Sequence, residues 1–575
     1  MKKFFSLTLA FLMLFPTIFS VGCAKKDDVI YLDVYNWEDY LCIDEDVNLI
    51  EAFEEMASEK YQKTVKVNYS TFGTNENMYN ELQLSKVKRE DGSYDYGYDL
   101  VCPSDYMIQK MILEGMVEKY DRTLNNLTNY DTYSSNYILN LFETNGWTDY
   151  ACAYMYGTMG FVYNPDVLAQ NGYQDGDELK WDLPWKTYYK NLGTIKDSIR
   201  DTYALAIGYV YSSELLTLKE SYNSGNYTES EYSKEVEKIF NLTDPETVQK
   251  VTDALTVLKG NVYGFEVDSG KRDMASGKIA INFAWSGDAV YTLDIAEEAG
   301  TELYYTVPEE GSNIWFDGWV MPKGANVELA QDFVNFLADP ENAKSNMNFI
   351  GYTPAVAGEE MVELCKEWYG VYTLIETTDV DNADFIDDDG TAYFEYYIQD
   401  AIDEGLLVEG INYTLNGIDS ETGYKKITVS EIKYPEYDDD ENIIGFTSEE
   451  NVELFDYDVS FLLTTREDNL NGVTYSVWTD TLGRQLTTQY PDRETVMRCA
   501  IMKHFSDEEM KRLNDMWDEV KVMAMPTWLM WFIVISILVV AVVYPIMAEL
   551  NKRGVRINIK RKNPNLRLIK REILK

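Results

Sequence analysis

The sequence predicts an α/β fold, on two observations from its first half and one from its length. Apolar side chains alternate at Ile30, Leu32 and Val34, which is the period of a half-buried strand. Residues 47–56 then carry apolar side chains at helical spacing, and residues 64–70 alternate again. Strands that alternate with helices indicate an α/β architecture, and 575 residues are enough for two or more domains.

Further elements follow in the same order along the chain. A helix capped by Thr74 carries Met78 and Leu82, and another helix opens at 197–201. The helix predicted over 329–338 stops before Pro340, because the residue that precedes a proline disfavours helical geometry. The remaining predicted strands of this part of the chain cover 98–102, 153–164 and 279–285.

Predicted loops after strands repeatedly place an aromatic side chain beside a carboxylate. Aromatic faces attract cations and carboxylates pair with ammonium groups, so a set of such loops suggests a cage for a cation. A single loop of this kind could equally be a rim tryptophan on a solvated acidic turn. The pairs are Trp37 with Asp39, Tyr106 with Asp105, Trp285 with Asp288, and Trp315 with Asp317.

The charge distribution favours a cationic partner. The formal net charge is −48, and the last 25 residues alone carry +9, so the preceding chain carries −57. A body this acidic repels nucleic acid and anionic ligands. A soluble, acidic extracellular surface would show the same composition.

The chemistry of an enzyme or a metal site is missing from the sequence. His504 is the single histidine, which argues against a catalytic triad or a histidine metal site. The six cysteines form no CxxC pair, so we interpret them mostly as buried thiols. With neither a histidine cluster nor a CxxC pair in the sequence, we expect no metal and no cofactor. The run 387–390 lacks the acids that a calcium loop needs at 385 and 396.

Both ends of the chain predict a membrane location. Residues 1–23 have the pattern of a signal peptide, and the ending at Cys23 resembles the lipobox of bacterial lipoproteins, which predicts lipidation of Cys23. Cleavage without a lipid is the alternative. Residues 526–548 are long and apolar enough to be a transmembrane helix rather than a buried core helix, and the basic tail 549–575 is expected in the cytoplasm.

Residues 375–480 form a very acidic stretch rich in Tyr and Asp. We interpret it as an insertion, β-rich, with predicted strands at 426–429 and 456–462 and a turn at 438–442.

Taken in order, several short motifs resemble the spermidine/putrescine-binding protein of a bacterial ABC importer, in its Gram-positive lipoprotein form. The resemblance covers roughly 29–360 and 480–521, and the order and spacing of the motifs carry it. They are Tyr35-Asn36-Trp37 with Tyr40, Thr74 to Tyr79, Asp99 to Ser104, Trp285 to Ala289, Trp315-Phe316-Asp317, Gly351 to Pro354, Leu482 to Gln485, Gln489 to Pro491 and Arg498 to Met502.

The resemblance implies a two-lobed, type 2 periplasmic-binding-protein fold with the ligand in the cleft, followed here by the C-terminal transmembrane helix. Lobe 1 would comprise 29–155 with 316–360 returning to it. Lobe 2 would comprise 156–315 with 361–521 returning to it, and would carry the insertion.

The same resemblance implies the ligand-binding residues. Trp285 would stack on the aliphatic chain of a polyamine, and Asp317 would hold an ammonium group. The family uses acids near the start of the helix at 197–201, where Asp201 replaces a glutamate and Ser198 an aspartate, and Met502 stands at the place of a glutamine. These departures leave putrescine or a shifted spermidine as the ligand. The implied set is Trp37, Tyr40, Ser104, Tyr106, Asp197, Asp201, Trp285, Trp315, Asp317 and Tyr352.

The function expected from these features is capture of spermidine or putrescine outside the membrane and delivery to the ABC permease and its ATPase. The chain would be held at the membrane by the lipid and by the C-terminal helix. A surface-anchored structural or adhesive protein that kept the fold is the alternative. We expect no enzymatic activity.

Overall fold

The computed structural model describes most of the chain between residues 29 and 521. The described residues are 29–44, 47–172, 179–387, 390–419, 422–437, 443–468, 470 and 473–521. The predicted signal peptide 1–23 with Cys23, the transmembrane helix 526–548 and the tail 549–575 lie outside these ranges. Among the residues described, no helix is both long and apolar enough to cross a membrane. The chain divides into Met1–Met516 and Trp517–Lys575, and all contacts reported below lie within the first unit.

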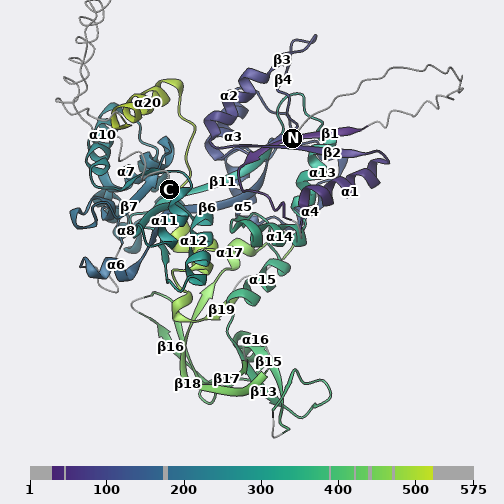
Figure 1. Cartoon of the computed structure of the whole chain (residues 1–575), viewed down its shortest axis with the longest axis vertical. Helices are drawn as coiled ribbons and strands as arrows, with labels where there is room; N and C mark the ends of the chain where they lie inside the picture. The colour runs from purple at the N-terminus through teal and green to yellow at the C-terminus, as the bar shows by residue number, and fades with distance from the viewer. Residues whose placement is uncertain are drawn as a thin grey trace, which may run out of the picture. The chain divides into compact units, whose positions relative to one another are not determined.

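One mixed sheet organises the first unit, in the strand order β2-β1-β5-β11-β6-β9-β7-β8. The first half-sheet consists of β1 (Ile30–Trp37), β2 (Val65–Phe72) and β5 (Leu100–Val101), which are mutually parallel. The second half-sheet consists of β7 (Gly193–Lys196), β8 (Gly264–Glu266) and β9 (Ile281–Trp285), also parallel. Figure 1 shows the two half-sheets on either side of β6 (Ala151–Tyr163) and β11 (Ser312–Val320).

Strands β6 and β11 join the half-sheets. They pair antiparallel with each other, β11 also pairs with β5, and β6 also pairs with β9. Both strands are buried almost throughout, so neither shows the alternation of buried and exposed residues by which a half-buried strand is recognised. The register between them shifts at Asp317/Gly318, and such a bulge re-aims the side chains beside it. The predicted lobe boundaries near 155 and 316 stay predictions.

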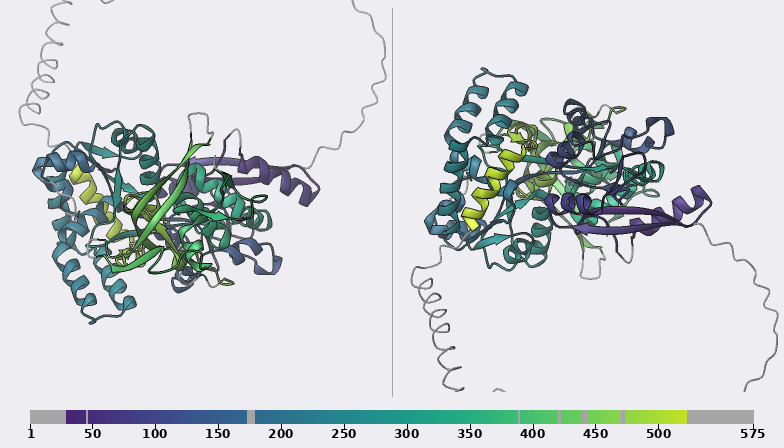
Figure 2. Two further views of the ribbon diagram at one scale, coloured as in Figure 1. Left: turned by 90° about the horizontal axis from the view of Figure 1, so that it is seen from below. Right: turned by 90° about the horizontal axis from the view of Figure 1, so that it is seen from above.

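Short strands extend this sheet and helices cover it. The strands β10 (Tyr304–Thr306) and β12 (Thr353–Pro354) pair with β6, and β20 (Cys499–Ala500) pairs with β11. A separate hairpin consists of β3 (Val87–Lys88) and β4 (Tyr94–Asp95). Figure 2 shows β1, β2 and α1 (Leu49–Tyr61) at the opposite end of the sheet from α8 (Ser212–Asn223), α9 (Glu229–Phe240) and α10 (Pro245–Lys259).

The other helices follow the strands in chain order. Before β6 lie α2 (Asn75–Ser85), α3 (Asp105–Leu113), η1 (Arg122–Leu124), α4 (Thr128–Tyr133) and α5 (Asn136–Thr144). Between β6 and β11 lie α6 (Pro165–Gln170), η2 (Leu183–Trp185), η3 (Thr187–Tyr189), α7 (Ile199–Val210), α11 (Ser269–Ala275) and α12 (Ser286–Glu298). After β11 lie α13 (Val327–Leu337), α14 (Pro340–Ile350), α15 (Glu359–Tyr369), α18 (Gln485–Gln489), α19 (Arg493–Met497) and α20 (Asp507–Lys521).

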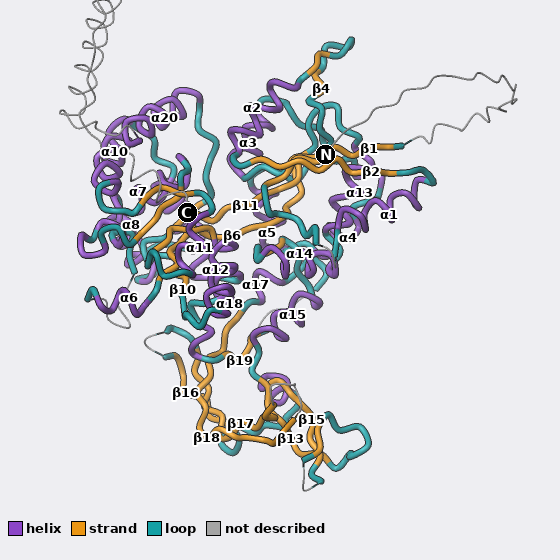
Figure 3. The backbone as a smooth tube through the Cα atoms, in the orientation of Figure 1, coloured by secondary structure: helices purple, strands orange, loops and turns teal. Residues whose placement is uncertain are grey.

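The acidic region after α15 builds a β-rich part with its own small core. Its elements are β13 (Tyr372–Thr377), β14 (Phe385–Ile386), β15 (Ala392–Tyr397), α16 (Ile398–Asp403), β16 (Tyr413–Ile418), β17 (Lys425–Tyr437), β18 (Ile443–Asp458), α17 (Ser460–Leu463), β19 (Thr474–Val477) and η4 (Thr479–Thr481). Ile398, Ile432 and Leu454 are fully buried in its apolar cluster. Figure 3 shows its strands in orange, connected to the rest through α15 and β19. The Tyr457 hydroxyl donates to the Tyr490 carbonyl and joins this part to α18.

Several local predictions are confirmed and others are wrong. The Thr74 hydroxyl accepts from the Asn77 amide and caps α2 as predicted. Trp315 and Asp317, predicted in a loop, lie inside β11, because their strand is paired on both sides and needs no polar alternation. The strand predicted over 456–462 ends at Asp458 and is followed by the short helix α17. The predicted turn at 438–442 lies outside the described residues.

Two acidic positions predicted in loops lie in helices instead. Asp105 and Tyr106 lie in the first turn of α3, and Asp288 lies in the first turn of α12. The reason is that carboxylates are favourable near a helix N-terminus.

Five cysteines are buried free thiols, as the sequence predicts. They are Cys42, Cys102, Cys152, Cys365 and Cys499.

A buried tryptophan shows how tightly the second half-sheet is packed. Trp181 is almost fully buried, packs edge-on against Phe161 and Phe283, and donates from Nε1 to the Gly311 carbonyl at 2.7 Å. Its ring also lies where a Cβ on Gly208 would be. The glycine at 208 therefore lets helix α7 contact this ring directly.

We expect Trp181→Ala to lower the free energy of unfolding by about 3–5 kcal/mol, because it opens a large cavity. Urea denaturation of the full chain in detergent, followed by tryptophan fluorescence, measures this change. Val257→Ala on α10 is the control, since Val257 is 64% exposed and should cost less than about 0.5 kcal/mol. Equal urea midpoints for the two variants would contradict this packing.

Candidate functional site

The carboxyl ends of parallel strands carry the side chains of the candidate site. Trp37 is the last residue of β1, Trp285 the last of β9 and Lys196 the last of β7. Because β7 and β9 are parallel neighbours, Lys196 and Trp285 leave the sheet at the same edge. This edge is where ligands bind in open α/β sheets.

Asp317 is the buried carboxylate at the centre of the site. The Tyr40 hydroxyl donates to Asp317 Oδ2 at 2.8 Å, and a backbone bridge joins Asp317 to Ser104. Asp317 is 5% exposed, and its Oδ1 has no hydrogen-bond partner among the residues that the structure describes. A buried acceptor without a donor is costly, so this oxygen is suited to receive a ligand group.

The protonation of Asp317 follows from this burial. Loss of solvation raises the pKa of Asp317 to about 7, and the charge of Asp201 also raises it, while the side chains of Ser104 and Tyr40 lower it. Near neutral pH the carboxyl is therefore balanced between its neutral and charged forms. A cation placed beside it would favour the charged form.

Aromatic rings form the wall around Asp317. The Tyr352 ring lies edge-on to Tyr40, with centroids 5.0 Å apart, and is tilted against Trp315 at 5.8 Å. Gly157 of β6 makes room for this wall, because a Cβ there would lie 2.5 Å from the Trp315 ring. Trp315 Nε1 is buried and, within the described part of the chain, has no hydrogen-bond acceptor.

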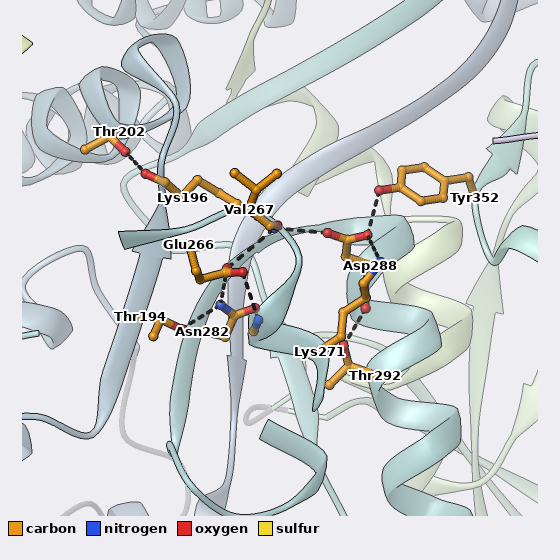
Figure 4. Close-up of polar contacts among 11 residues, drawn as sticks. Thr194, Lys196, Thr202, Glu266, Val267, Lys271, Asn282, Asp288, Thr292 and Tyr352 are labelled. Carbon is orange, nitrogen blue, oxygen red and sulfur yellow. Dashed lines mark hydrogen bonds and ion pairs between the residues drawn. The ribbon is translucent and has the colours of Figure 1, made fainter. Parts of the chain in front are cut away.

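A polar network in the second half-sheet meets this wall at Tyr352 (Figure 4). The Tyr352 hydroxyl donates to Asp288 Oδ1 at 2.9 Å, and Lys196 Nζ donates to Asp288 Oδ2 at 3.0 Å. Lys196 Nζ also lies 4.2 Å from the centroid of the Trp285 ring. Burial raises the pKa of Asp288, but Lys196 and Lys271 outweigh it and the pKa lies below its usual value.

An acidic cluster borders the site on the side of α2, α3 and α7. Burial raises the pKa of Asp105 well above its usual range and raises the pKa of Asp201. Arg200 is the neighbouring cation, and its guanidinium lies 4.5 Å from the centroid of the Tyr106 ring. The Tyr106 hydroxyl donates to Glu76 Oε1 at 3.1 Å. Carboxylates outnumber cations in this cluster.

The structure brings most of the residues predicted for the site together. Tyr40, Ser104, Trp315, Asp317 and Tyr352 form one connected group through the contacts above.

The other predicted residues differ in how they join that group. Trp285 is connected to Tyr352 of this group through Lys196 and Asp288. Asp201 acts on the group through its charge, which raises the pKa of Asp317. Tyr106 lies in the acidic cluster, and Trp37 packs against Phe72 at 4.6 Å.

Asp197 is placed differently from its prediction. Its side chain is exposed, while its backbone amide donates to the Glu266 carbonyl at 2.7 Å. The reason is the helix start. Ser198 caps α7 by accepting from the Asp201 amide, so Asp201 lies in the first turn of the helix, whereas Asp197 precedes the cap. Glu38 and Asp39, beside Trp37, are exposed as well.

Sequence reasoning missed Lys196 and the position of Asp288 as its partner. A signal existed for Lys196, since it ends a strand whose other residues are all buried, Gly193 to Ile195. The pairing itself could not be found, because the two residues are 92 positions apart.

Comparison with known proteins places the chain in a family. Residues 48–371 match the bacterial extracellular solute-binding protein family, and the chain belongs to that family. The predicted resemblance to its spermidine/putrescine-binding members is confirmed, as is the mixed α/β periplasmic-binding-protein fold.

Individual relatives carry polyamine names. The chain is 29% identical over 384 residues to the spermidine/putrescine-binding periplasmic protein of Escherichia coli. The aligned residues cover 66% of this chain and 93% of that protein. It is 28% identical over 346 residues to the putrescine-binding periplasmic protein SpuD of Pseudomonas aeruginosa. That alignment covers 59% of this chain and 82% of SpuD. Among solved structures, the chain is similar to the crystal structure of the spermidine/putrescine ABC transporter substrate-binding protein of Streptococcus pneumoniae, with a TM-score of 0.40 and 28% identity. The match covers 57% of this chain and 83% of that protein.

We expect burial of Asp317 to make the ligand-free protein less stable as the pH rises. A carboxyl whose folded pKa is about 7, against about 3.9 unfolded, binds its proton more tightly in the folded state. Stability is therefore lost between these two pH values, by on the order of 4 kcal/mol. Asp317→Asn removes this loss, so it should be more stable than the wild type at pH 8 and similar to it at pH 4.5.

Urea denaturation at the two pH values measures the difference. Asp39→Asn is the control, because Asp39 is exposed and its replacement should change stability by less than about 0.5 kcal/mol at either pH. An Asp317→Asn variant with the same stability difference from the wild type at both pH values would show that this carboxyl is not buried.

Proposed function

We propose that this chain is the extracellular binding component of an ABC importer and that it captures a polyamine. The observation that carries the proposal is Asp317, a buried carboxylate with one unsatisfied oxygen inside a wall of aromatic rings. Membership of the solute-binding family and the polyamine names of the relatives support it.

The site has the two kinds of surface that a polyamine needs. A polyamine alternates ammonium groups with methylene runs. Asp317 and the acidic cluster around Asp201 can pair with the ammonium groups, and Trp315, Tyr352 and Trp285 can cover the methylenes. Each cation–π contact contributes about 0.5–2 kcal/mol, depending on how far it is desolvated.

Delivery and anchoring complete the proposal. The bound polyamine passes to the membrane permease, which works with its ATPase, and the chain is held beside them by a lipid on Cys23 and by a membrane helix at 526–548. Tethering at the membrane raises the effective concentration of the binding protein near the permease. In this function the chain binds its ligand and does not transform it.

We expect Asp317→Asn to weaken polyamine binding at least about tenfold, which corresponds to about 1.4 kcal/mol, because the amide cannot neutralise an ammonium group. Isothermal titration calorimetry of the full chain in detergent with putrescine and spermidine measures the affinity. Asp39→Asn removes an exposed carboxylate close to the same wall and should leave the affinity within about twofold.

The ligand panel also includes amino acids as neutral and anionic comparators. Failure of the wild type to bind either polyamine would overturn the proposed function and favour a structural or adhesive role. Unchanged affinity in Asp317→Asn would remove Asp317 from the site.

We expect polyamine affinity to fall as the pH is lowered from 8 to 6. The ammonium group needs the charged form of Asp317, and the pKa of about 7 means that this form is lost across that range. Binding near pH 7 should therefore release protons, which calorimetry detects as a dependence of the apparent enthalpy on the buffer. Asp317→Asn should abolish most of this dependence, and a pH-independent affinity in the wild type would contradict it.

A further inference from the structure

We propose that Lys196 is a built-in cation that makes the site select a diamine over a triamine. The inference rests on the proposed polyamine binding and names the substrate class within it.

Lys196 is held in the network by burial and by several contacts at once. The residue is 1% exposed, and Nζ donates to the Val267 carbonyl at 2.7 Å and to Asp288 Oδ2 at 3.0 Å, with Glu266 Oε1 at 3.6 Å. Burial alone would lower the pKa of Lys196, but Asp288 and Glu266 outweigh it and the pKa lies above its usual value. The ammonium group therefore stays charged at neutral pH.

The two buried carboxylates beside Lys196 are already occupied by protein groups. Asp288 is shared by Lys196, Lys271 and the Tyr352 hydroxyl. Glu266 accepts from the Gly270 amide at 2.8 Å and from Asn282 Nδ2 at 3.0 Å, besides facing Lys196. Figure 4 shows these buried side chains turned toward one another, and the exposed carboxylate of Asp268 also raises the pKa of Lys196.

The face of Trp285 is also affected by this lysine. Its ring already has an ammonium group 4.2 Å from its centroid. A second ammonium group near this ring would be repelled by Lys196 in a buried, low-dielectric setting, where charges are poorly screened. Trp285 can still cover methylene groups, because these carry no charge.

Asp317, by contrast, is a buried carboxylate that no lysine contacts among the described residues, and it accepts from the Tyr40 hydroxyl. Asp317 keeps an oxygen without a partner among the described residues, and Asp201 lies close enough to raise its pKa. Glu76 adds to this charge, whereas Asp105 does not, because burial raises the pKa of Asp105 well above its usual range. The cations that act on Asp201 are Lys196 and Arg200, which both lower its pKa. Two ammonium groups can be neutralised here, whereas a third would have to lie toward Lys196.

The test compares putrescine, a diamine, with spermidine, a triamine, by calorimetry on the full chain in detergent. We expect the wild type to bind putrescine at least about tenfold more tightly than spermidine. Lys196→Met removes the charge and one of the partners of Asp288, so spermidine should gain at least about tenfold while putrescine changes by less than about threefold.

Lys271→Met is the matched control, because it removes an ammonium group from the same Asp288 carboxylate. Lys271 lies 3.3 Å from Asp288 Oδ1, but its side chain is 20% exposed and its ammonium group lies over Tyr291, not over Trp285. This variant should keep the wild-type ratio of the two affinities within about threefold.

Lys196→Met with Asp288→Asn removes both members of the pair, and it provides the test if the single variant does not fold. Its spermidine affinity should rise at least about threefold relative to putrescine. An unchanged ratio in the folded variant, or a wild type that binds spermidine as tightly as putrescine, overturns this inference and leaves polyamine binding intact. A wild type that binds neither amine overturns the proposed function and this inference with it.

Discussion

The candidate site depends on the burial of one carboxylate, Asp317, which has no neutralising cation beside it among the residues that the structure describes. The protein stabilises Asp317 with a tyrosine hydroxyl and a serine, which is weaker compensation than a lysine or an arginine would provide. The remaining cost raises the pKa and leaves an oxygen that a cationic ligand can satisfy. The aromatic wall of Tyr40, Trp315 and Tyr352 both causes this burial and supplies the surface for the ligand's methylene groups.

The second half of the site solves the same electrostatic problem in the opposite way. Asp288 is buried as deeply as Asp317, but it has Lys196 and Lys271 as partners, and its pKa is lowered instead of raised. Tyr352 contacts both regions, with its ring against Tyr40 and its hydroxyl on Asp288. One half of the site is therefore prepared for a positive ligand, and the other is already neutral.

Local patterns predicted much of the fold because the forces involved act over a few residues. The alternation at Ile30 to Val34 became β1, and the Thr74 cap became the start of α2. The sequence predicts a loop at Trp315 and Asp317, because a strand paired on both sides loses the alternation by which strands are recognised. The Asp197 side chain is exposed, because a shift of a few residues at a helix start changes which side chain faces inward.

The sequence by itself determined the class of the protein, the acidic character of its body, and the residue types of a cation site, since composition and short motifs carry these. Only the tertiary structure decided which carboxylates are free. Tyr40 and Asp317 are 277 positions apart, and Lys196 and Asp288 are 92 apart. Whether a buried acid meets a hydroxyl or an ammonium group depends on the strand order around β6 and β11, and no local pattern records that order.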